Sequence, residues 1–369
     1  MVELAEIIRA AGPAYGHGRP SAQQRALRDI VQCRTPALGG SLYRCDACGT
    51  LEYRYHSCRN RHCPKCQEDR AQDWLARTRA RLLPCDHYLL TFTLPASLRA
   101  VAQAHPQLVY AALLREAAAA VQTLAADRAW VGGTLGILAV LHTWSRTLAY
   151  HPHAHLLVTA GGLAPDGTTW VRPAHPRFLC PGYMLSALVR AKLHQALTRA
   201  GLAQTIDPSV WQQRWIVHVQ AIGRGDHAAR YLARYVYRVA LTNERIERVA
   251  EGQVTFRYTH ARTHETRRLT LPVAAFLARF LQHVLPRGFT KIRAYGLLSP
   301  SRKPDLERAR ALLALHAART ASTTADPPRP PPPPTDLLGL TTDVIPRCPA
   351  CHRGALCLVG RVPRSRAPP

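Results

Sequence analysis

The sequence predicts an α+β fold, in which a small metal-bound domain precedes a larger mixed domain. Between about residues 86 and 300, apolar runs of strand length alternate with amphipathic helical stretches. Residues 33–66 are instead dense in Cys, His and Arg, and they hold too few apolar side chains for a core of their own. Residues 321–336 are rich in proline and predict an extended linker.

The elements of the larger domain follow from apolar periodicity. Helical spacing is found in residues 97–127, 182–201 and 273–284. Strands are expected at residues 87–94, 134–144, 153–160 and 214–220, and in a hairpin formed by 254–260 and 267–272. We therefore divide the chain into four segments: a helical lead-in with the cysteine-rich domain, the α+β domain, a helical extension with the linker, and a basic tail containing cysteines. Their bounds are 1–85, 86–300, 301–336 and 337–369.

The chain is strongly basic. Its 369 residues include 49 Lys and Arg against 23 Asp and Glu, which gives a net charge of +26 and a pI near 10.5. This charge predicts a polyanionic partner, usually nucleic acid, and a membrane-surface protein is the weaker alternative because no Lys/Arg-rich amphipathic helix stands out. No membrane-spanning run, signal peptide or GxxxxGK[ST] phosphate-binding loop is recognisable. We expect a DNA-binding protein of the reducing cytoplasm, without a membrane or a nucleotide cofactor.

Paired cysteines predict zinc. Cys45 with Cys48, and Cys63 with Cys66, form two CxxC pairs that can supply four thiolates to one tetrahedral zinc ion. A bound metal would also stabilise a segment with so little core. Unpaired structural or redox cysteines are the alternative.

Further metal ligands remain after this assignment. A second zinc site could form from Cys33, Cys58, His56 and His62, or these side chains could line the first site. Near the C-terminus, Cys348 and Cys351 form another CxxC pair, for which His352 and Cys357 are candidate partners.

Because basic residues surround the cysteines, we expect the zinc module to contact DNA. The predicted DNA contacts of the chain are Arg59, Arg61, Lys65, Arg230 and Arg234.

Two histidines in the sequence HAHLLV are a candidate site for a divalent ion. Side chains alternate along a strand, so His153 and His155 point to one face while Ala154 points to the other. Two imidazoles on a rigid strand can bind one divalent ion and leave coordination positions open. An HxH pattern is also frequent by chance, so the motif alone leaves the role of the pair undecided.

The stretch RYLARYVYRVALTN, residues 230–243, holds three tyrosines on a predicted helix. Tyr231 and Tyr235 are one turn apart on the same face. Tyr237 lies roughly 200° around the helix from Tyr235, so the three rings cannot share one site. Tyr237, Trp144 and Trp215 could stack on bases, although core packing is the simpler role for each. Spacing alone assigns no chemistry to the tyrosine pair.

Taken together, these motifs resemble one known family. The segments CRTPALGG, CDACG, SCRNRHCPKCQ, FTLP, HTW, HPHAHLLVTAGGL, YLARYVYRVALTN, VTFRY and LPRGFTKIRAYGLL occur in the order found in the rolling-circle insertion-sequence transposases of the HUH (histidine–hydrophobic–histidine) two-tyrosine superfamily. The resemblance covers roughly residues 30 to 300. It implies an antiparallel sheet with flanking helices and catalytic tyrosines on a helix, preceded by a transposase zinc-binding domain.

The resemblance also implies roles for individual residues. His153 and His155 match the metal-binding histidines, Tyr231 and Tyr235 match the nucleophiles, and the four CxxC cysteines match the zinc-binding domain. Many relatives carry His two residues after the second Tyr, where this chain has Tyr237. A third metal ligand is therefore left unassigned; His227 is a candidate that the family pattern does not support.

The expected chemistry is transfer of a DNA strand through a 5′-phosphotyrosine link, with Mg²⁺ or Mn²⁺ at the histidines. A covalent link conserves the energy of the phosphodiester, so rejoining needs no ATP. The resemblance implies that the substrate is single-stranded DNA at transposon ends, with hairpins, at the nucleoid of a bacterium. Two alternatives stay open: a rolling-circle replication initiator or relaxase, and a non-catalytic zinc-finger DNA-binding protein.

Overall fold

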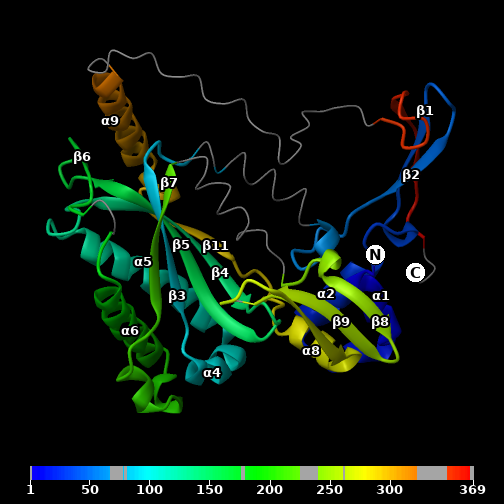
Figure 1. Ribbon diagram of the computed structural model, residues 1–369, viewed down its shortest axis with the longest axis horizontal. Helices are drawn as coiled ribbons and strands as arrows, with labels where there is room; N and C mark the ends of the chain where they lie inside the picture. The colour runs from blue at the N-terminus through cyan, green and yellow to red at the C-terminus, as the bar shows by residue number, and fades with distance from the viewer. Residues whose placement is uncertain are drawn as a thin grey trace. The chain divides into compact units, whose positions relative to one another are not determined.

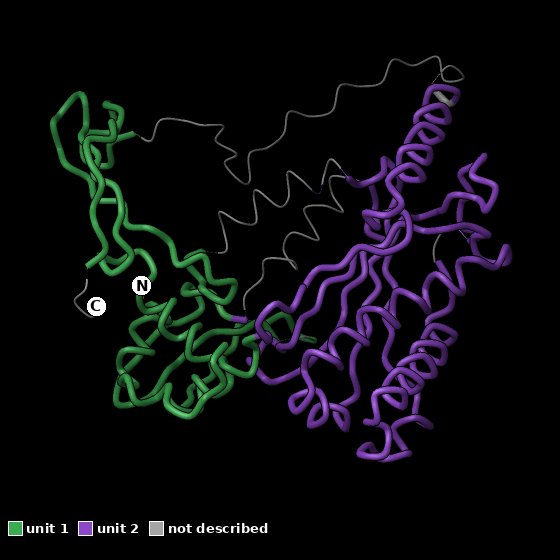
Figure 2. The backbone as a smooth tube through the Cα atoms, turned by 180° about the vertical axis from the view of Figure 1, so that it is seen from behind, with its two compact units in different colours: residues 1–72, 241–284, 328–369 green, residues 73–240, 285–327 purple. Residues whose placement is uncertain are grey.

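The chain folds into two compact units. The computed structural model describes residues 2–66, 78, 81–175, 179–224, 240–260, 262–321 and 347–365. Unit 1 comprises residues 1–72, 241–284 and 328–369, and unit 2 comprises residues 73–240 and 285–327 (Figure 2). Each unit is therefore built from segments that are distant in sequence.

The centre of unit 2 is an antiparallel sheet in the order β11-β4-β5-β3-β7, with β6 paired to β5 (Figure 1). Its strands are β3 (Asp86–Thr93), β4 (Thr134–Trp144), β5 (Tyr150–Leu163), β6 (Trp170–Val171), β7 (Val217–Arg224) and β11 (Ile292–Gly296). The apolar runs that predicted strands at residues 87–94, 134–144, 153–160 and 214–220 correspond to β3, β4, β5 and β7. Strand β5 lies between β4 and β3, so its side chains have neighbours on both sides.

Helices and apolar segments cover both faces of this sheet. Helices α4 (Arg99–Ala104), α5 (Pro106–Ala125) and α6 (Gly182–Arg199) pack on one face over a large core that includes Phe92 and Leu156. On the other face, Leu89, Val140 and Leu157 pack with residues of α9 (Lys303–Ala321). Both faces need apolar residues, which explains the nearly continuous apolar runs of β4 and β5.

Helix α5 is long and apolar enough to cross a bilayer, and it is the only such helix among the described residues. Of its most apolar window, 61% is buried inside the protein. Its composition is that of a helix packed in a core.

Unit 1 contains two small sheets and three helices in its described part. The helices are α1 (Leu4–Ala10), α2 (Ser21–Gln32) and α8 (Val273–Leu281). One sheet has the order β10-β9-β8, from β8 (Ile246–Ala250), β9 (Gln253–Thr259) and β10 (Thr266–Pro272). The other has the order β12-β1-β2, from β1 (Gly40–Cys45), β2 (Leu51–Tyr55) and β12 (Leu356–Val362).

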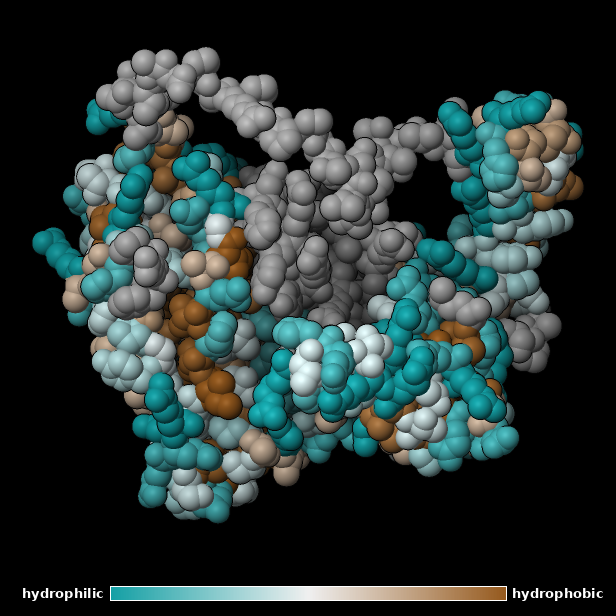
Figure 3. Space-filling model, in the orientation of Figure 1, coloured by the Kyte–Doolittle hydropathy of each residue, from teal (hydrophilic) through white to brown (hydrophobic). Residues whose placement is uncertain are grey.

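The hairpin predicted at residues 254–272 is confirmed as β9 and β10. One face of this sheet packs on α8, where the ring centroids of Phe256 and Phe276 lie 5.8 Å apart. Hydrophilic residues dominate the visible surface over β8 and β9 (Figure 3). A single-sided sheet of this kind produces the alternating apolar and polar pattern by which its strands were recognised.

Single turns of 3-10 helix connect several elements. They are Pro13–Gly16, Pro36–Leu38, Pro64–Cys66, Ala96–Leu98, Ala203–Thr205, Pro208–Trp211, Asn243–Arg245 and Pro300–Arg302.

The units differ from the four consecutive segments expected from composition. Residues 241–284, placed by composition in the α+β domain, belong to unit 1, and so does the C-terminal segment. The reason is tertiary: the segment 241–284 forms its own sheet and helix, and β12 pairs with β1. The α+β class with antiparallel sheets is confirmed.

Candidate functional site

Three histidines gather on one face of the unit 2 sheet. His153 and His155 lie two residues apart on β5 and share a face, as expected for a strand. His142 on β4 is the direct cross-strand partner of His153. On the other side of β5, Thr91 of β3 pairs with His155. Three neighbouring strands thus position the cluster, which makes its geometry rigid.

The imidazoles are arranged as ligands of one ion would be. The ring centroids of His142 lie 5.3 Å from His153 and 4.8 Å from His155, and those of His153 and His155 are 4.8 Å apart. One ring nitrogen from each residue lies within 4.8 Å of the others. His142 and His155 are buried and His153 is half-buried. Three nitrogen donors converging from rigid strands suit a first-row divalent ion with open coordination positions.

Hydrogen bonds orient two of the rings. Nδ1 of His153 donates to the backbone carbonyl of His151 at 2.7 Å, which leaves its Nε2 lone pair available. Nδ1 of His155 lies 3.0 Å from the hydroxyl of Thr91, and the same tautomer results when Nδ1 donates to that oxygen. Burial lowers the pKa of His153 to about 4, so this imidazole is neutral at pH 7. Neutral, oriented imidazoles are the form that binds metal.

The sequence alone does not identify His142 as a ligand, because its position opposite His153 depends on strand register. The HTW segment was visible as part of a strand, but the sequence alone does not show which residue lies opposite His153. The signal available was a third histidine on the preceding strand, separated from HAH by one tight connection. In the structure Trp144 stacks on His142 with ring centroids 4.6 Å apart, whereas Trp215 is 4% exposed and bonds the carbonyl of Val210. Trp215 is thus a core residue, whereas Trp144 is half-buried and its ring also contacts Lys291.

The predicted tyrosine helix lies outside the described residues. This applies to Tyr231, Tyr235 and Tyr237, and also to His227 and the predicted DNA contacts Arg230 and Arg234. Of the remaining predicted DNA contacts, Arg59 is exposed and Arg61 is half-buried. Lys65 forms an ion pair with Glu3, Nζ to Oε2 2.5 Å.

The predicted zinc ligands are divided between two clusters. Cys63 and Cys66 do not join Cys45 and Cys48 but meet Cys33 and Cys58. Cys45 and Cys48 meet the C-terminal pair, Cys348 and Cys351. The grouping of the two N-terminal CxxC pairs into one site is therefore corrected. Because β1 pairs with β12, Cys45 and Cys48 meet cysteines that follow them by about 300 positions in sequence.

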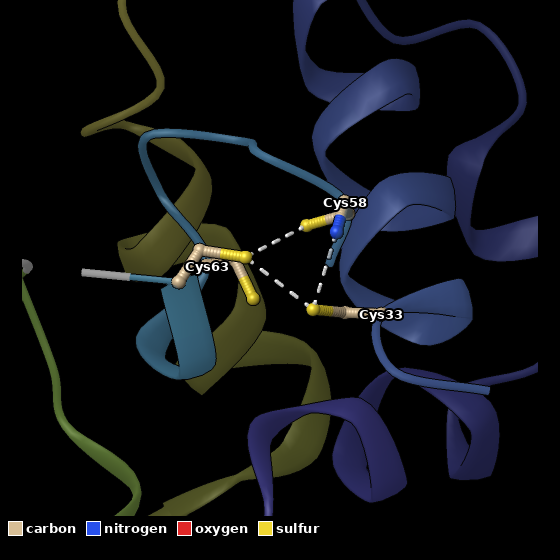
Figure 4. A group of neighbouring side chains, drawn as sticks. Cys33, Cys58 and Cys63 are labelled. Atoms are coloured by element: carbon tan, nitrogen blue, oxygen red, sulfur yellow. Dashed lines mark hydrogen bonds between the residues drawn. The ribbon is translucent and has the colours of Figure 1, made fainter. Parts of the chain in front are cut away.

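The first cluster involves four cysteines and neither of the predicted histidines. Cys33 lies at the C-terminal end of α2, and the Sγ atoms of Cys33, Cys58 and Cys63 point toward one another (Figure 4). Cys66 Sγ lies 3.4 Å from Cys33 Sγ and 3.5 Å from Cys58 Sγ. Four thiolates bound to one zinc at about 2.3 Å are separated by about 3.8 Å, which is close to this spacing.

His56 and His62 are not members of either cluster, which corrects the mixed second site expected from the sequence. The backbone N–H of His56 donates to the Gly39 carbonyl, and its carbonyl accepts from the Arg34 N–H. The side chain of His56 is exposed. Within the cluster, the hydrogen bond between the Sγ atoms of Cys33 and Cys66 lowers the pKa of Cys66, so a thiolate is favoured there. All cysteines of the chain are free of disulfides.

Comparisons with known proteins agree with these features. Residues 7–94 match a family model described as "Transposase zinc-binding domain", and residues 136–305 match one described as "Putative transposase". The "Putative transposase y4qJ" of Sinorhizobium fredii is 35% identical over 97% of this chain and 94% of its own. The "Transposase for insertion sequence element IS801" of Pseudomonas savastanoi pv. phaseolicola is 30% identical over 75% of this chain and 72% of its own. No solved structure matches.

The zinc-binding match contains all four cysteines of the first cluster, and that cluster supports a structural zinc there. The transposase match contains His142, His153 and His155. The chain belongs to the two-tyrosine insertion-sequence transposases that carry an N-terminal zinc-binding domain, the family of the IS801 transposase.

Proposed function

We propose that this transposase nicks and rejoins single-stranded DNA at the ends of its insertion sequence, through 5′-phosphotyrosine intermediates on Tyr231 and Tyr235. The observation that carries the proposal is the cluster of three imidazoles on strands β4 and β5. Such a cluster, in a basic chain of a transposase family, supports a metal-assisted phosphoryl transfer.

The covalent step exchanges one ester bond of phosphorus for another. The phenolic oxygen of a tyrosine forms a bond to phosphorus, and the bond from phosphorus to the 3′ oxygen breaks. The phenol proton is lost to solvent, and the leaving 3′ oxygen takes up a proton to become a hydroxyl. In the reverse direction, a 3′ hydroxyl attacks the phosphotyrosine and restores the phosphodiester, so no nucleotide cofactor is required. Two tyrosines allow one strand to be held while another is cut, as rolling-circle transposition requires.

The residues of this chain fit a catalytic ion. His142, His153 and His155 would hold Mg²⁺ or Mn²⁺, and nitrogen ligands favour Mn²⁺ over Mg²⁺. When bound, such an ion would polarise the scissile phosphate and offset the charge of its oxygens. His151 and Thr91 keep the imidazoles oriented through their hydrogen bonds. Strands β3, β4 and β5 hold these groups in place before substrate arrives.

DNA contacts are proposed for both units. In unit 1, Arg59 and Arg61 lie between Cys58 and Cys63 of the first cluster in sequence. Together with Lys65, they would bind the DNA at the end of the insertion sequence. Arg230 and Arg234 flank the tyrosines in sequence and would hold the strand that is cut. Single-stranded, hairpin-containing ends and action at the bacterial nucleoid complete the proposal.

The test uses the full chain, oligonucleotides from the element's ends, and Mg²⁺ or Mn²⁺, with products separated on a denaturing gel. A protein–DNA adduct is expected in the wild type and in Tyr237→Phe, and its loss is expected in the double variant Tyr231→Phe/Tyr235→Phe. An adduct that persists in the double variant would refute the assignment. Binding without any adduct in the wild type would identify the non-catalytic DNA-binding alternative.

A further inference from the structure

Two segments about 300 residues apart in sequence meet at the second cysteine cluster. Cys45 and Cys48 close the turn between β1 and β2, and Cys348 and Cys351 precede β12. Cys45 Sγ lies 3.7 Å from Cys351 Sγ, and Cys48 Sγ lies 3.7 Å from Cys348 Sγ. These distances are too long for a disulfide of about 2.05 Å and match the ~3.8 Å between thiolates that share a tetrahedral zinc.

Both CxxC turns have the same local geometry. The residue after each pair is in the left-handed region, Gly49 with φ 73° and His352 with φ 57°. The same backbone bond closes each turn, from the N–H of Gly49 to the Cys45 carbonyl at 3.1 Å and from the N–H of His352 to the Cys348 carbonyl at 2.9 Å. In addition, the N–H of Cys48 points to Cys45 Sγ and the N–H of Gly354 points to Cys351 Sγ, each at 3.5 Å. Backbone N–H groups directed at the sulfurs stabilise thiolates, as metal-binding turns require.

The turns are also fitted to each other. Asp46 accepts a hydrogen bond from the Ala355 N–H at 2.8 Å and donates its own N–H to the Ala355 carbonyl at 3.1 Å. A β-carbon on Gly354 would overlap Cys45 Sγ and lie 2.6 Å from Asp46 Oδ1, so only glycine permits this approach.

Apolar packing at this place is too small to hold the segment alone. The local core consists of three buried residues, Cys45, Cys348 and Leu356, with Tyr43 and Cys351 packed against them. Large apolar side chains of the same sheet, among them Tyr53 and Leu358, are more than half exposed. A sheet with so little buried apolar surface needs another source of stability.

We propose that Cys45, Cys48, Cys348 and Cys351 bind a second structural zinc. This ion would hold residues 347–365 against the hairpin of β1 and β2. Residues 347–365 lie outside both segments that match the family models, and they form an integral strand of the zinc module. The metal closes the chain into a ring of about 300 residues that contains unit 2. Cys357, on β12 but outside the cluster, is left as an exposed free thiol.

Metal analysis of the purified full chain tests the proposal. Two zinc ions per chain are expected, one for each cluster of four cysteines. The variant Cys348→Ser/Cys351→Ser should retain one, and the matched control Cys357→Ser, on the same strand, should retain two. A wild type with one zinc, or a double variant that still binds two, would overturn the proposal.

A ligand exchange gives an answer even if the serine variant does not fold. In protein loaded with Co²⁺, Cys351→His should keep both metal ions of the two cysteine clusters. Its thiolate-to-cobalt absorbance should fall by the contribution of one of the eight cysteine ligands. Cys357→His should leave that absorbance unchanged. An unchanged absorbance in Cys351→His would show that Cys351 is not a ligand, and a loss in Cys357→His would show that Cys357 is one; either result would contradict the site.

Discussion

The hydrogen bond between Thr91 and His155 gives a sharp test of the metal site, because it can be removed without removing a ligand. The Thr91 hydroxyl lies 3.0 Å from Nδ1 of His155 and fixes the orientation of that ring. In Thr91→Val the shape of the side chain is kept and the hydrogen bond is lost. The ring must then be ordered by the ion itself, so the ion binds more weakly.

The expected size of the effect follows from the single bond that is lost. A neutral hydrogen bond contributes about 0.5–1.5 kcal/mol, and loss of a partner that orients a metal-bound His weakens metal binding about 10- to 100-fold. We therefore expect a Kd for Mn²⁺ about tenfold higher, which is about 1.4 kcal/mol. Nicking should need more Mn²⁺ but reach the wild-type rate at saturation, because the ligands themselves remain.

Mn²⁺ binding can be followed by the paramagnetic resonance of the free ion in zinc-loaded protein. The control is Thr123→Val, which removes a hydroxyl bonded to the Ala119 carbonyl within α5 at 2.9 Å. This control should bind Mn²⁺ as the wild type does. Unchanged Mn²⁺ affinity in Thr91→Val, or a lower rate that saturating Mn²⁺ does not restore, would refute the role given to this hydrogen bond.

Three further predictions concern unit 2. His142→Ala removes a ligand and should weaken Mn²⁺ binding more than about 100-fold while zinc content stays the same; wild-type Mn²⁺ affinity would exclude His142 from the site. Burial lowers the pKa of His87 from 6.5 to about 4, so its contribution to stability is complete above pH 6.5 and declines as pH falls toward 4, by about 2 kcal/mol at pH 5. In the variant His87→Leu, the temperature of thermal unfolding should therefore fall less than in the wild type as the pH is lowered toward 4. An identical pH dependence in the two proteins would contradict this role of His87. Gly296→Ala should destabilise the fold by about 1–3 kcal/mol more than Gly223→Ala in urea unfolding, because both have positive φ but only at Gly296 would a β-carbon overlap the Leu135 carbonyl; equal losses would contradict this.

Most of the unit 2 sheet was predictable because its apolar runs are long and bounded. Strands β4 and β5 are buried on both faces, so their sequences are nearly continuous in apolar residues. The shared face of His153 and His155 followed from strand alternation alone. His142 could not be placed in this way, since only the pairing of β4 with β5 brings it opposite His153.

The cysteine sites show a different limit of local reasoning. Spacing identifies a CxxC turn, but four cysteines in two turns do not reveal which turns meet. Cys33 and Cys58 have no pair pattern, yet the end of α2 and the loop after β2 bring them to Cys63 and Cys66. The partner of Cys45 and Cys48 lies beyond the proline-rich segment, and only the pairing of β12 with β1 connects them.

Identification of the nucleophile decides whether Tyr231 and Tyr235 carry the reaction. The wild-type protein is allowed to react with an element-end oligonucleotide and Mn²⁺, the adduct is digested with nuclease and protease, and the modified peptide is sequenced by mass spectrometry. We expect a nucleotide joined through its 5′ phosphate to Tyr231 or Tyr235, formed in the wild type and absent when His153 and His155 are replaced by Ala. A nucleotide on any other residue, or an adduct that forms equally well without the two histidines, would contradict it.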